Sequence, residues 1–305
     1  MVLTLLKLPK KINKILSKLK LYLEANFLHI NVSKSKFMHF RTPRQATRND
    51  DDIDIKFGNT PLQRVESIKF LGIIMEEKLS WVKHTQHVIC KMRSSIGSLY
   101  EMRKVIPKKL KTVVYNSIIN SQLSYGISVW GAYSNIDRLK PLFLLQKRAL
   151  RNLFSIRRVS RFIRGHTKLV FRDYNILTVY NIYNYMTLLI IDKLFKLKEP
   201  QYLYEILQLN KPNHSRNNRI YLPFLKSTQY QNNFCYQGPS LWNLLSSHAT
   251  ICNNITKSPS LNTMKTRLKK FLVRMQSHGI DENDESWYEL NHSIPLFLNM
   301  IKDTT

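Results

Sequence analysis

Glycine, cysteine and acidic residues are all scarce in this sequence of 305 residues. Only 8 residues are glycine, and neither GxGxxG nor GxxxxGK[ST] occurs, which excludes the common glycine-rich loops that bind nucleotide phosphates. The three cysteines, Cys90, Cys235 and Cys252, lie far apart and leave one unpaired, so they form neither a disulfide framework nor a zinc knuckle. We therefore expect a reducing, intracellular setting, in the nucleus or the cytoplasm.

Long apolar runs are also missing. No run of about 18 apolar residues occurs, and residues 2–6 are too short for the core of a signal peptide. The sequence therefore predicts neither secretion nor membrane insertion. Residues 9–27 have apolar side chains at helical spacing with lysines between them. Such a helix can lie on a membrane surface, but packing of its apolar face against a protein core is the favoured interpretation.

Positive charge dominates the composition. The sequence has 48 Lys and Arg against 20 Asp and Glu, a formal net charge of +28. With 43% hydrophobic residues it can still bury ordinary cores, which excludes global disorder. Between residues 102 and 280 the acids are Asp137, Asp173, Asp192, Glu199 and Glu205. This excess of cations predicts a polyanionic partner.

The pattern of apolar residues predicts an α+β fold that is predominantly α-helical. Short clusters of apolar and β-branched residues between turn formers predict a small β region, with extended segments at 36–41, 53–57 and 67–75. Helical spacing then dominates. The helices are expected from 84 to 102, after Pro107, and over 110–125, 136–154, 179–197 and 261–275. Residues 210–218 have the composition of a loop.

Two motifs in the first third of the chain are similar to those of a known family. The run YLEANFLHINVSKSK at 22–36 resembles the end of the palm in reverse transcriptases of jockey-type non-LTR retrotransposons, although Tyr22 stands where the family usually has Trp. The run IKFLGI at 68–73, followed by LSW at 79–81, resembles the strand pair that the family calls the primer grip. The two motifs occur in the family's order and at its spacing.

The resemblance continues to about residue 275. YGISVWG at 125–131 and LQKRALR at 145–151 resemble the thumb and the region after it, and YQGPSLWN at 236–243 resembles a segment near the C-terminus of the family's polyproteins. The resemblance implies four parts. They are a palm remnant with a primer-grip hairpin (1–83), a helical thumb (84–165), a basic helical C-terminal region (166–280) and an acidic tail (281–305).

The chain departs from the family at the catalytic carboxylates. These hold two metal ions in such polymerases, and in the family they come from an earlier strand and an aromatic-Ala-Asp-Asp hairpin, neither of which occurs here. The acids at 50–52 are better explained by a solvated loop than by a metal site, and the acids at 76–77 are another adjacent pair. We predict no catalytic residue, metal site or cofactor, with Mg²⁺ needed only by an intact polymerase.

The resemblance also implies positions close to the substrate. Lys34 matches the family's lysine near the phosphates of the incoming nucleotide, and the alternative is a surface lysine. Phe70, Leu71 and Gly72 match the primer grip, where a missing Cβ lets the backbone approach the primer strand. Without the resemblance, an apolar strand with one glycine is typical of a core.

Cations are densest just after the thumb motif. No acid lies among them, so they repel one another unless a polyanion binds, although a solvated face is the alternative. These predicted phosphate contacts are Lys147, Arg148, Arg151, Arg157, Arg158, Arg161 and Arg164. A second basic group spans residues 103–111. Trp130, Tyr236 and Trp242 are more typical of packing anchors than of base-stacking platforms.

The sequence therefore predicts the part of a retrotransposon RNA-directed DNA polymerase that holds the template and primer. It would bind RNA and RNA–DNA duplex through phosphates and would not polymerise by itself. Two alternatives remain open. In the first, the chain is a piece of an intact, active reverse transcriptase that is truncated in the gene model. In the second, it is a domesticated module that binds RNA or protein.

Overall fold

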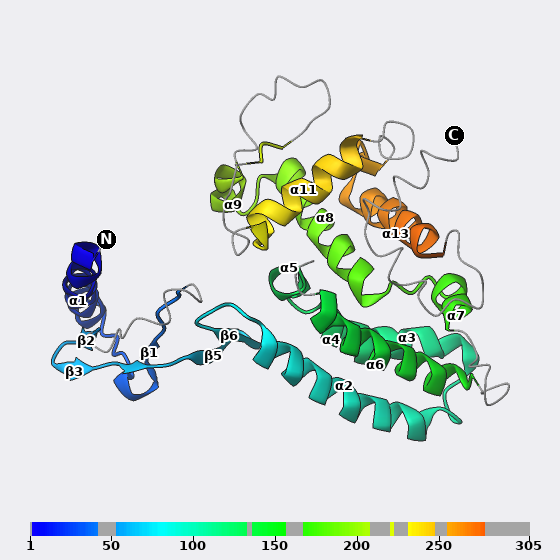
Figure 1. The fold of residues 1–305 in the computed structure, drawn as a ribbon, viewed down its shortest axis with the longest axis horizontal. Coiled ribbons are helices and arrows are strands. Elements are labelled where there is room, and N and C mark those ends of the chain that lie inside the picture. The colour runs from blue at the N-terminus through cyan, green and yellow to red at the C-terminus, as the bar shows by residue number, and fades with distance from the viewer. Residues whose placement is uncertain are drawn as a thin grey trace. The chain divides into compact units, whose positions relative to one another are not determined.

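The computed structural model describes residues 2–41, 53–132, 136–156, 167–207, 220–222, 231–247 and 255–277 (Figure 1). Its fold is α+β and predominantly helical, which confirms the predicted fold class. Contacts within the chain divide it into two compact units, Met1–His84 and Thr85–Thr305. The predicted division into four functional parts stays a prediction.

The first unit contains one long helix and three pairs of short strands. Its elements are α1 (Val2–Ala25), the 3₁₀ turn η1 (Val32–Lys34), β1 (Lys36–Phe37), β2 (Lys56–Phe57), β3 (Thr60–Pro61), β4 (Gln63–Arg64), β5 (Ser67–Phe70) and β6 (Ile73–Glu76). β1 pairs in parallel with β4, whereas β2–β3 and β5–β6 are antiparallel hairpins. Each predicted extended segment therefore contains a strand, and the third forms a hairpin.

The polar face of α1 carries the contact that joins it to the β region. The side-chain amide of Asn13 donates from Nδ2 to the carbonyl oxygen of Asp54 at 3.1 Å, and its Oδ1 accepts from the backbone N–H of Lys56 at 3.0 Å. The Asn13 side chain thus bonds to one backbone acceptor and one backbone donor, as an adjacent β-strand would. One carboxamide thus fixes the position of α1 beside the β2–β3 hairpin.

The apolar face of α1 is covered only in part, so the prediction that it packs against a core is met only in part. Ile12, Leu16 and Leu23 are half-buried, whereas Ile15 is 56% exposed and Tyr22 is 64% exposed. The physical reason is the size of the β region, since paired strands of two to four residues offer no sheet face broad enough to cover a helix. In the described part of this unit the buried apolar side chains are Ile55 and Trp81.

Glu77 ties the strands of the first unit together. Its side chain is 9% exposed and lies 3.2 Å from Nη2 of Arg41 and 3.5 Å from Nη2 of Arg64. The backbone N–H of Arg41 also donates to the carbonyl oxygen of Glu77 at 3.2 Å. A carboxylate at this depth is costly unless it is paired, and two guanidinium groups supply that pairing.

The second unit is helical, and α2 (Val82–Met102) enters it from the first. The elements that follow are η2 (Lys108–Leu110), α3 (Lys111–Tyr115), the π-turn η3 (Asn116–Asn120), α4 (Ser121–Ser124), α5 (Ile127–Trp130), α6 (Ile136–Phe154), α7 (Lys168–Asp173), α8 (Val179–Leu197), α9 (Gln201–Ile206), α11 (Phe234–Ser247) and α13 (Leu261–Ser277). The predicted helices at 136–154 and 179–197 are confirmed with their bounds. α11 was not predicted.

Helix α8 is the centre of the second unit. Its sequence is apolar on nearly all sides, and a helix of that kind is stable only when other elements cover it. Helices α11 and α13 pack against it, and α4, α5 and α6 also contact it (Figure 1). Gly238 of α11 permits one close approach, since a Cβ added there would lie 3.1 Å from Cδ1 of Ile191.

Two buried glutamines hold the entry of α8. Gln146 of α6 accepts from the N–H of Val179 at 3.0 Å and donates to the carbonyl oxygen of Leu177 at 2.8 Å. Gln276 of α13 accepts from the N–H of Thr178 at 3.1 Å and donates to the carbonyl oxygen of Ile176 at 2.7 Å. The first backbone N–H groups of a helix lack partners within it, and here two other helices supply them.

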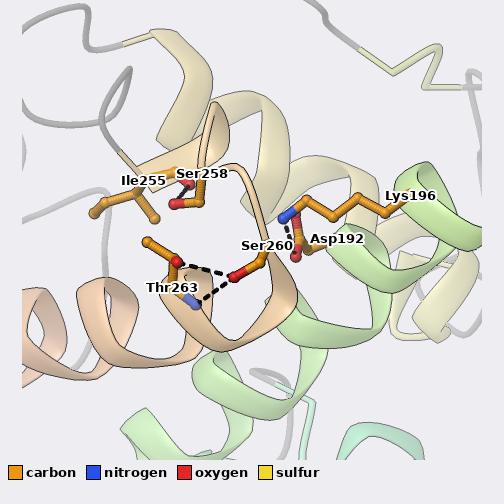
Figure 2. A network of polar contacts seen from close by, with 6 residues as sticks. All are labelled: Asp192, Lys196, Ile255, Ser258, Ser260 and Thr263. Atoms are coloured by element: carbon orange, nitrogen blue, oxygen red, sulfur yellow. Dashed lines mark hydrogen bonds and ion pairs between the residues drawn. The ribbon is translucent and has the colours of Figure 1, made fainter.

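The first turn of α13 lies beside an ion pair of α8 (Figure 2). Ser260 caps α13 by accepting from the N–H of Thr263 at 3.1 Å. Asp192 of α8 has a side chain that is 1% exposed, and Nζ of Lys196 lies 2.7 Å away. Burial raises the pKa of the Asp192 carboxyl above its ordinary value, and the bond from Lys196 offsets part of that rise.

The glutamine contacts predict a large loss of stability when one of them is removed. Gln276→Met keeps the volume but leaves Thr178 N, Ile176 O and the amide of Asn181 without their buried partner. We expect the free energy of unfolding to fall by about 2–4 kcal/mol in urea titrations followed by circular dichroism. The control is Gln86→Met at an exposed position of α2, with an expected change within about 0.5 kcal/mol. Equal changes in the two variants would contradict the assignment.

Candidate nucleic-acid interface

Lys34 closes the 3₁₀ turn η1. Oδ1 of Asn31 accepts from the N–H of Lys34 at 3.2 Å and from the hydroxyl of Ser33 at 2.6 Å. This cap holds the backbone of the turn and leaves the side chain of Lys34 exposed. The position is compatible with a phosphate contact and with a plain surface lysine, so the role of Lys34 stays a prediction.

The β5–β6 hairpin presents apolar side chains at its tip. Phe70 pairs with Ile73, so Leu71 and Gly72 form a two-residue turn. Their φ angles are +46° and +83°, the signs that a type I′ turn requires. Phe70 is 58% exposed and Leu71 is 74% exposed. The alternative of a strand buried in a core is therefore wrong, while the primer-grip role stays a prediction.

The base of this hairpin is held to the start of α2. Lys83 donates from its N–H to Oε2 of Glu76 at 3.1 Å and from Nζ to the hydroxyl of Ser67 at 2.9 Å. The N–H of Ile74 donates to Nδ1 of His84 at 3.2 Å. Glu76 is thus occupied as a helix cap. The exposed tip projects from a fixed base.

The predicted cation cluster is only partly within the described residues. Lys147 is 8% exposed, with Nζ 5.5 Å from the centroid of the Phe143 ring, so it packs inside the helical unit. Arg148 is exposed on α6 and Arg151 is half-buried. The remaining members, Arg157, Arg158, Arg161 and Arg164, lie outside the described residues. The phosphate contacts of the cluster stay predictions.

The second basic group surrounds the turn after α2. Arg103 stacks with its guanidinium carbon 3.5 Å from the centroid of the Tyr100 ring. Lys104, Lys108 and Lys109 are exposed. The ammonium of Lys111 lies 5.9 Å from the centroid of the Phe154 ring. The flexible lysines between these two stacked cations remain accessible to an anion.

Helix α13 has an exposed basic side and a buried apolar side, which the sequence analysis did not distinguish. Its 17 residues include five cations and no acid. Arg267, Lys270 and Arg274 are exposed at positions i, i+3 and i+7, so they follow one side of the helix; we call them the α13 basic row. The opposite side is fixed by buried residues such as Met264, Leu268 and Leu272. The spacing of these apolar residues was the signal that could have separated the two sides.

Trp130 and Trp242 are packing anchors, as interpreted from the sequence. Trp130 is 1% exposed and donates from Nε1 to the carbonyl oxygen of Tyr125 at 2.9 Å. Trp242 is 4% exposed, with its ring centroid 5.0 Å from that of Phe195. Tyr236 is half-buried. Neither indole is accessible for stacking on a base.

Acidic residues in the described ranges do not gather into a metal site. Within those ranges no three His, Cys, Asp or Glu residues are close enough to share an ion. Glu77 is engaged by two arginines, and the acids at 50–52 lie outside the described residues. Among the described helices, none has the length and apolar character needed to cross a bilayer.

Comparison with known proteins gives one distant similarity. A probable RNA-directed DNA polymerase from transposon X-element of Drosophila melanogaster is 23% identical over 158 residues, which cover 51% of this chain and 16% of that protein. No family model and no solved structure matches the chain. The chain thus spans a small part of the length of that relative. The similarity supports a reverse-transcriptase-like fragment.

The strained hairpin tip generates a prediction. Leucine at φ +46° costs about 1 kcal/mol, and asparagine tolerates this conformation better. We expect Leu71→Asn to slow amide hydrogen exchange in β5 and β6 about fivefold and to weaken binding of an RNA–DNA duplex. The matched control is Leu79→Asn, because Leu79 also has a positive φ of +49° but lies outside the hairpin. Unchanged duplex affinity in Leu71→Asn would refute a contact at the tip.

Proposed function

We propose that this chain is the part of a jockey-type retrotransposon reverse transcriptase that holds the template–primer duplex, and that it corresponds to the C-terminal part of the polymerase region. The observation that carries the proposal is helix α13, where five cations occur without an acid and a row of three is exposed. The distant similarity to a transposon RNA-directed DNA polymerase supports it.

The binding mechanism is neutralisation of phosphates. Like charges at helical spacing repel one another in the free protein, and a duplex backbone relieves that repulsion while it releases counterions. Exposed Arg148, the lysines at 104–109 and the α13 basic row supply the charge. Contacts of this kind select the shape of a duplex and not its base sequence.

The apolar hairpin tip complements the cations. Phe70 and Leu71 are exposed beside Gly72, whose missing side chain lets the backbone come close to a sugar–phosphate chain. Lys34 is exposed on the same unit. In this proposal the tip rests against the primer and Lys34 lies near the phosphates of the incoming nucleotide.

The chain should not polymerise alone. Two-metal phosphoryl transfer needs carboxylates that hold both ions. Glu76 and Glu77 are adjacent acids in the described residues, but Glu76 caps α2 and Glu77 is paired with two arginines. We expect no extension of a primer on an RNA template with Mg²⁺ or Mn²⁺, measured by incorporation of labelled nucleotides. Incorporation that disappears in Asp51→Asn/Asp52→Asn would show that residues 50–52 form a metal site.

Salt titrations test the binding surface. We compare two triple variants by fluorescence anisotropy with an RNA–DNA duplex, one with Arg267, Lys270 and Arg274 changed to Gln and one with Lys10, Lys11 and Lys14 changed to Gln. Both remove three exposed cations from a helix. The α13 variant should bind the duplex less tightly than the other. Its slope of log K against log salt should flatten by about 0.9 for each phosphate that the protein no longer neutralises, on the B-DNA calibration.

Equal decreases in affinity in the two variants would mean that only the diffuse charge of +28 attracts the duplex. Affinity that stays constant between low and physiological salt would remove the electrostatic mechanism altogether. Circular dichroism before each titration checks that the helix content is unchanged.

A further inference from the structure

A polar pocket opens in the helical unit beside the entry of α8. Its volume is about 270 Å³, and side chains from η3, α4, α8, α13 and the loop before α8 line it. The polar lining consists of three asparagines, a serine, two tyrosines and a lysine: Asn116, Asn120, Asn175, Ser124, Tyr115, Tyr185 and Lys269. Buried Ile176, Leu177 and Ile182 form its floor. Among the described residues that line it, none carries a carboxylate.

The fold uses only part of the polar lining of this pocket: the hydroxyl of Ser124 donates to the carbonyl oxygen of Ser121 at 3.4 Å, and the hydroxyl of Tyr115 accepts from Gln146 at 2.7 Å. Within the ranges that the structure describes, the side-chain amides of Asn116, Asn120 and Asn175 make no hydrogen bond, and the ammonium of Lys269 makes no ion pair. Elsewhere in the same unit, Gln146 and Gln276 are fully engaged. Carboxamides that converge on one pocket without internal partners are available to a ligand.

The pocket is also lined by an irregular stretch of helix, the π-turn η3. Asn116 and Asn120 are the ends of the π-turn η3, which interrupts the α-helical hydrogen bonding between α3 and α4. Such turns are rare and often occur at functional sites. Tyr115, which precedes the turn, is anchored by Gln146 through a 2.7 Å bond to its hydroxyl. The irregular turn is therefore held in place by the same glutamine that holds α8.

We infer that this pocket takes one unpaired nucleotide of a bound nucleic acid, with its base against Tyr185 and the asparagine amides and its phosphate at Lys269. The inference rests on the proposed function and specifies a part of it. Carboxamides match the donors and acceptors on the edge of a base, an aromatic ring stacks on its face, and a lysine pairs with phosphate.

Size and charge favour a single nucleotide. The pocket is slightly smaller than the about 300–1,000 Å³ of sites that bury drug-sized ligands, so it suits one unit of a polymer. Lys265 lies four residues before Lys269 and is exposed on the same side of α13, so a second phosphate can bind next to the pocket. Burial raises the pKa of Tyr185, which keeps its hydroxyl neutral and able to donate.

The test compares a fully paired RNA–DNA duplex with the same duplex carrying a single-nucleotide bulge. We expect the wild-type protein to bind the bulged duplex about tenfold more tightly by fluorescence anisotropy, the size of one base–aromatic stack. A 2-aminopurine at the bulge should lose fluorescence on binding. Bulges placed in the RNA strand and in the DNA strand identify which strand supplies the nucleotide, and a preference on either supports the inference.

Variants assign the preference to the pocket. Tyr185→Leu and, independently, Asn120→Ala should reduce the bulged-to-paired affinity ratio to about one while leaving affinity for the paired duplex unchanged. Lys269→Gln should lower the ratio, whereas its exposed neighbour Lys270→Gln should weaken both duplexes equally. Circular dichroism confirms that each variant is folded.

A ratio of one in the wild-type protein overturns the pocket inference and leaves the proposed function standing, provided that the paired duplex binds with a steep salt dependence. A ratio that survives both Tyr185→Leu and Asn120→Ala also overturns it, because the bulge is then recognised elsewhere. Absence of binding to either duplex refutes the proposed function together with the pocket.

Discussion

The hydrogen bonds of Gln146 and Gln276 with the backbone of residues 176–179 are the contacts on which the helical unit depends. Each glutamine gives one donor and one acceptor, as a neighbouring β-strand would. Together they connect α6 and α13 to the entry of α8, and Gln146 also reaches Tyr115 of α3. Helices α4, α5, α9 and α11 also pack on α8, so its placement positions them. Through Tyr115, Gln146 also anchors the residue that precedes the π-turn η3.

The same device occurs at two further places. Asn13 bonds to the backbone on both sides of residue 55, and Asn243 of α11 bonds to both the N–H and the carbonyl oxygen of Ile220, at 2.6 and 2.7 Å. Carboxamides are neutral, so these joints add nothing to the repulsion within a chain of charge +28, and salt does not screen them. These carboxamide joints are therefore insensitive to salt, whereas the proposed contacts with the partner depend on it.

Sequence periodicity was sufficient where an element is long and regular. It predicted α6 and α8 with their bounds, because apolar residues at helical spacing run without a break through both. It missed α11, since Gly238 and Pro239 are breakers by local preference and only packing against Ile191 explains a glycine there. It also counted Lys147 among surface cations, although the ring of Phe143 covers its side chain. Burial of one lysine in a basic run depends on tertiary contacts that spacing alone does not contain.

The sequence predicted the type of ligand for the candidate site, but it did not predict where all of the site's residues lie. Charge and the family resemblance indicated a polyanion, and the hairpin tip was located through the resemblance of residues 68–73 to the primer grip. The π-turn had no local signature, because Asn116 and Asn120 sit at ordinary helical spacing. The pocket joins Asn116 of η3 with Lys269, which lies 153 positions further along the chain. Only the packing around α8 brings them together.

The glutamine contacts have a consequence for local opening of the chain. Thr178 and Val179 lie at the first turn of α8, and amides at helix starts ordinarily exchange with solvent by fraying. Here their N–H groups are bound to side chains of α13 and α6, so exposure of either amide requires the loss of a buried contact between helices. We therefore expect the amides of Thr178 and Val179 to exchange more slowly than those of an ordinary helix start.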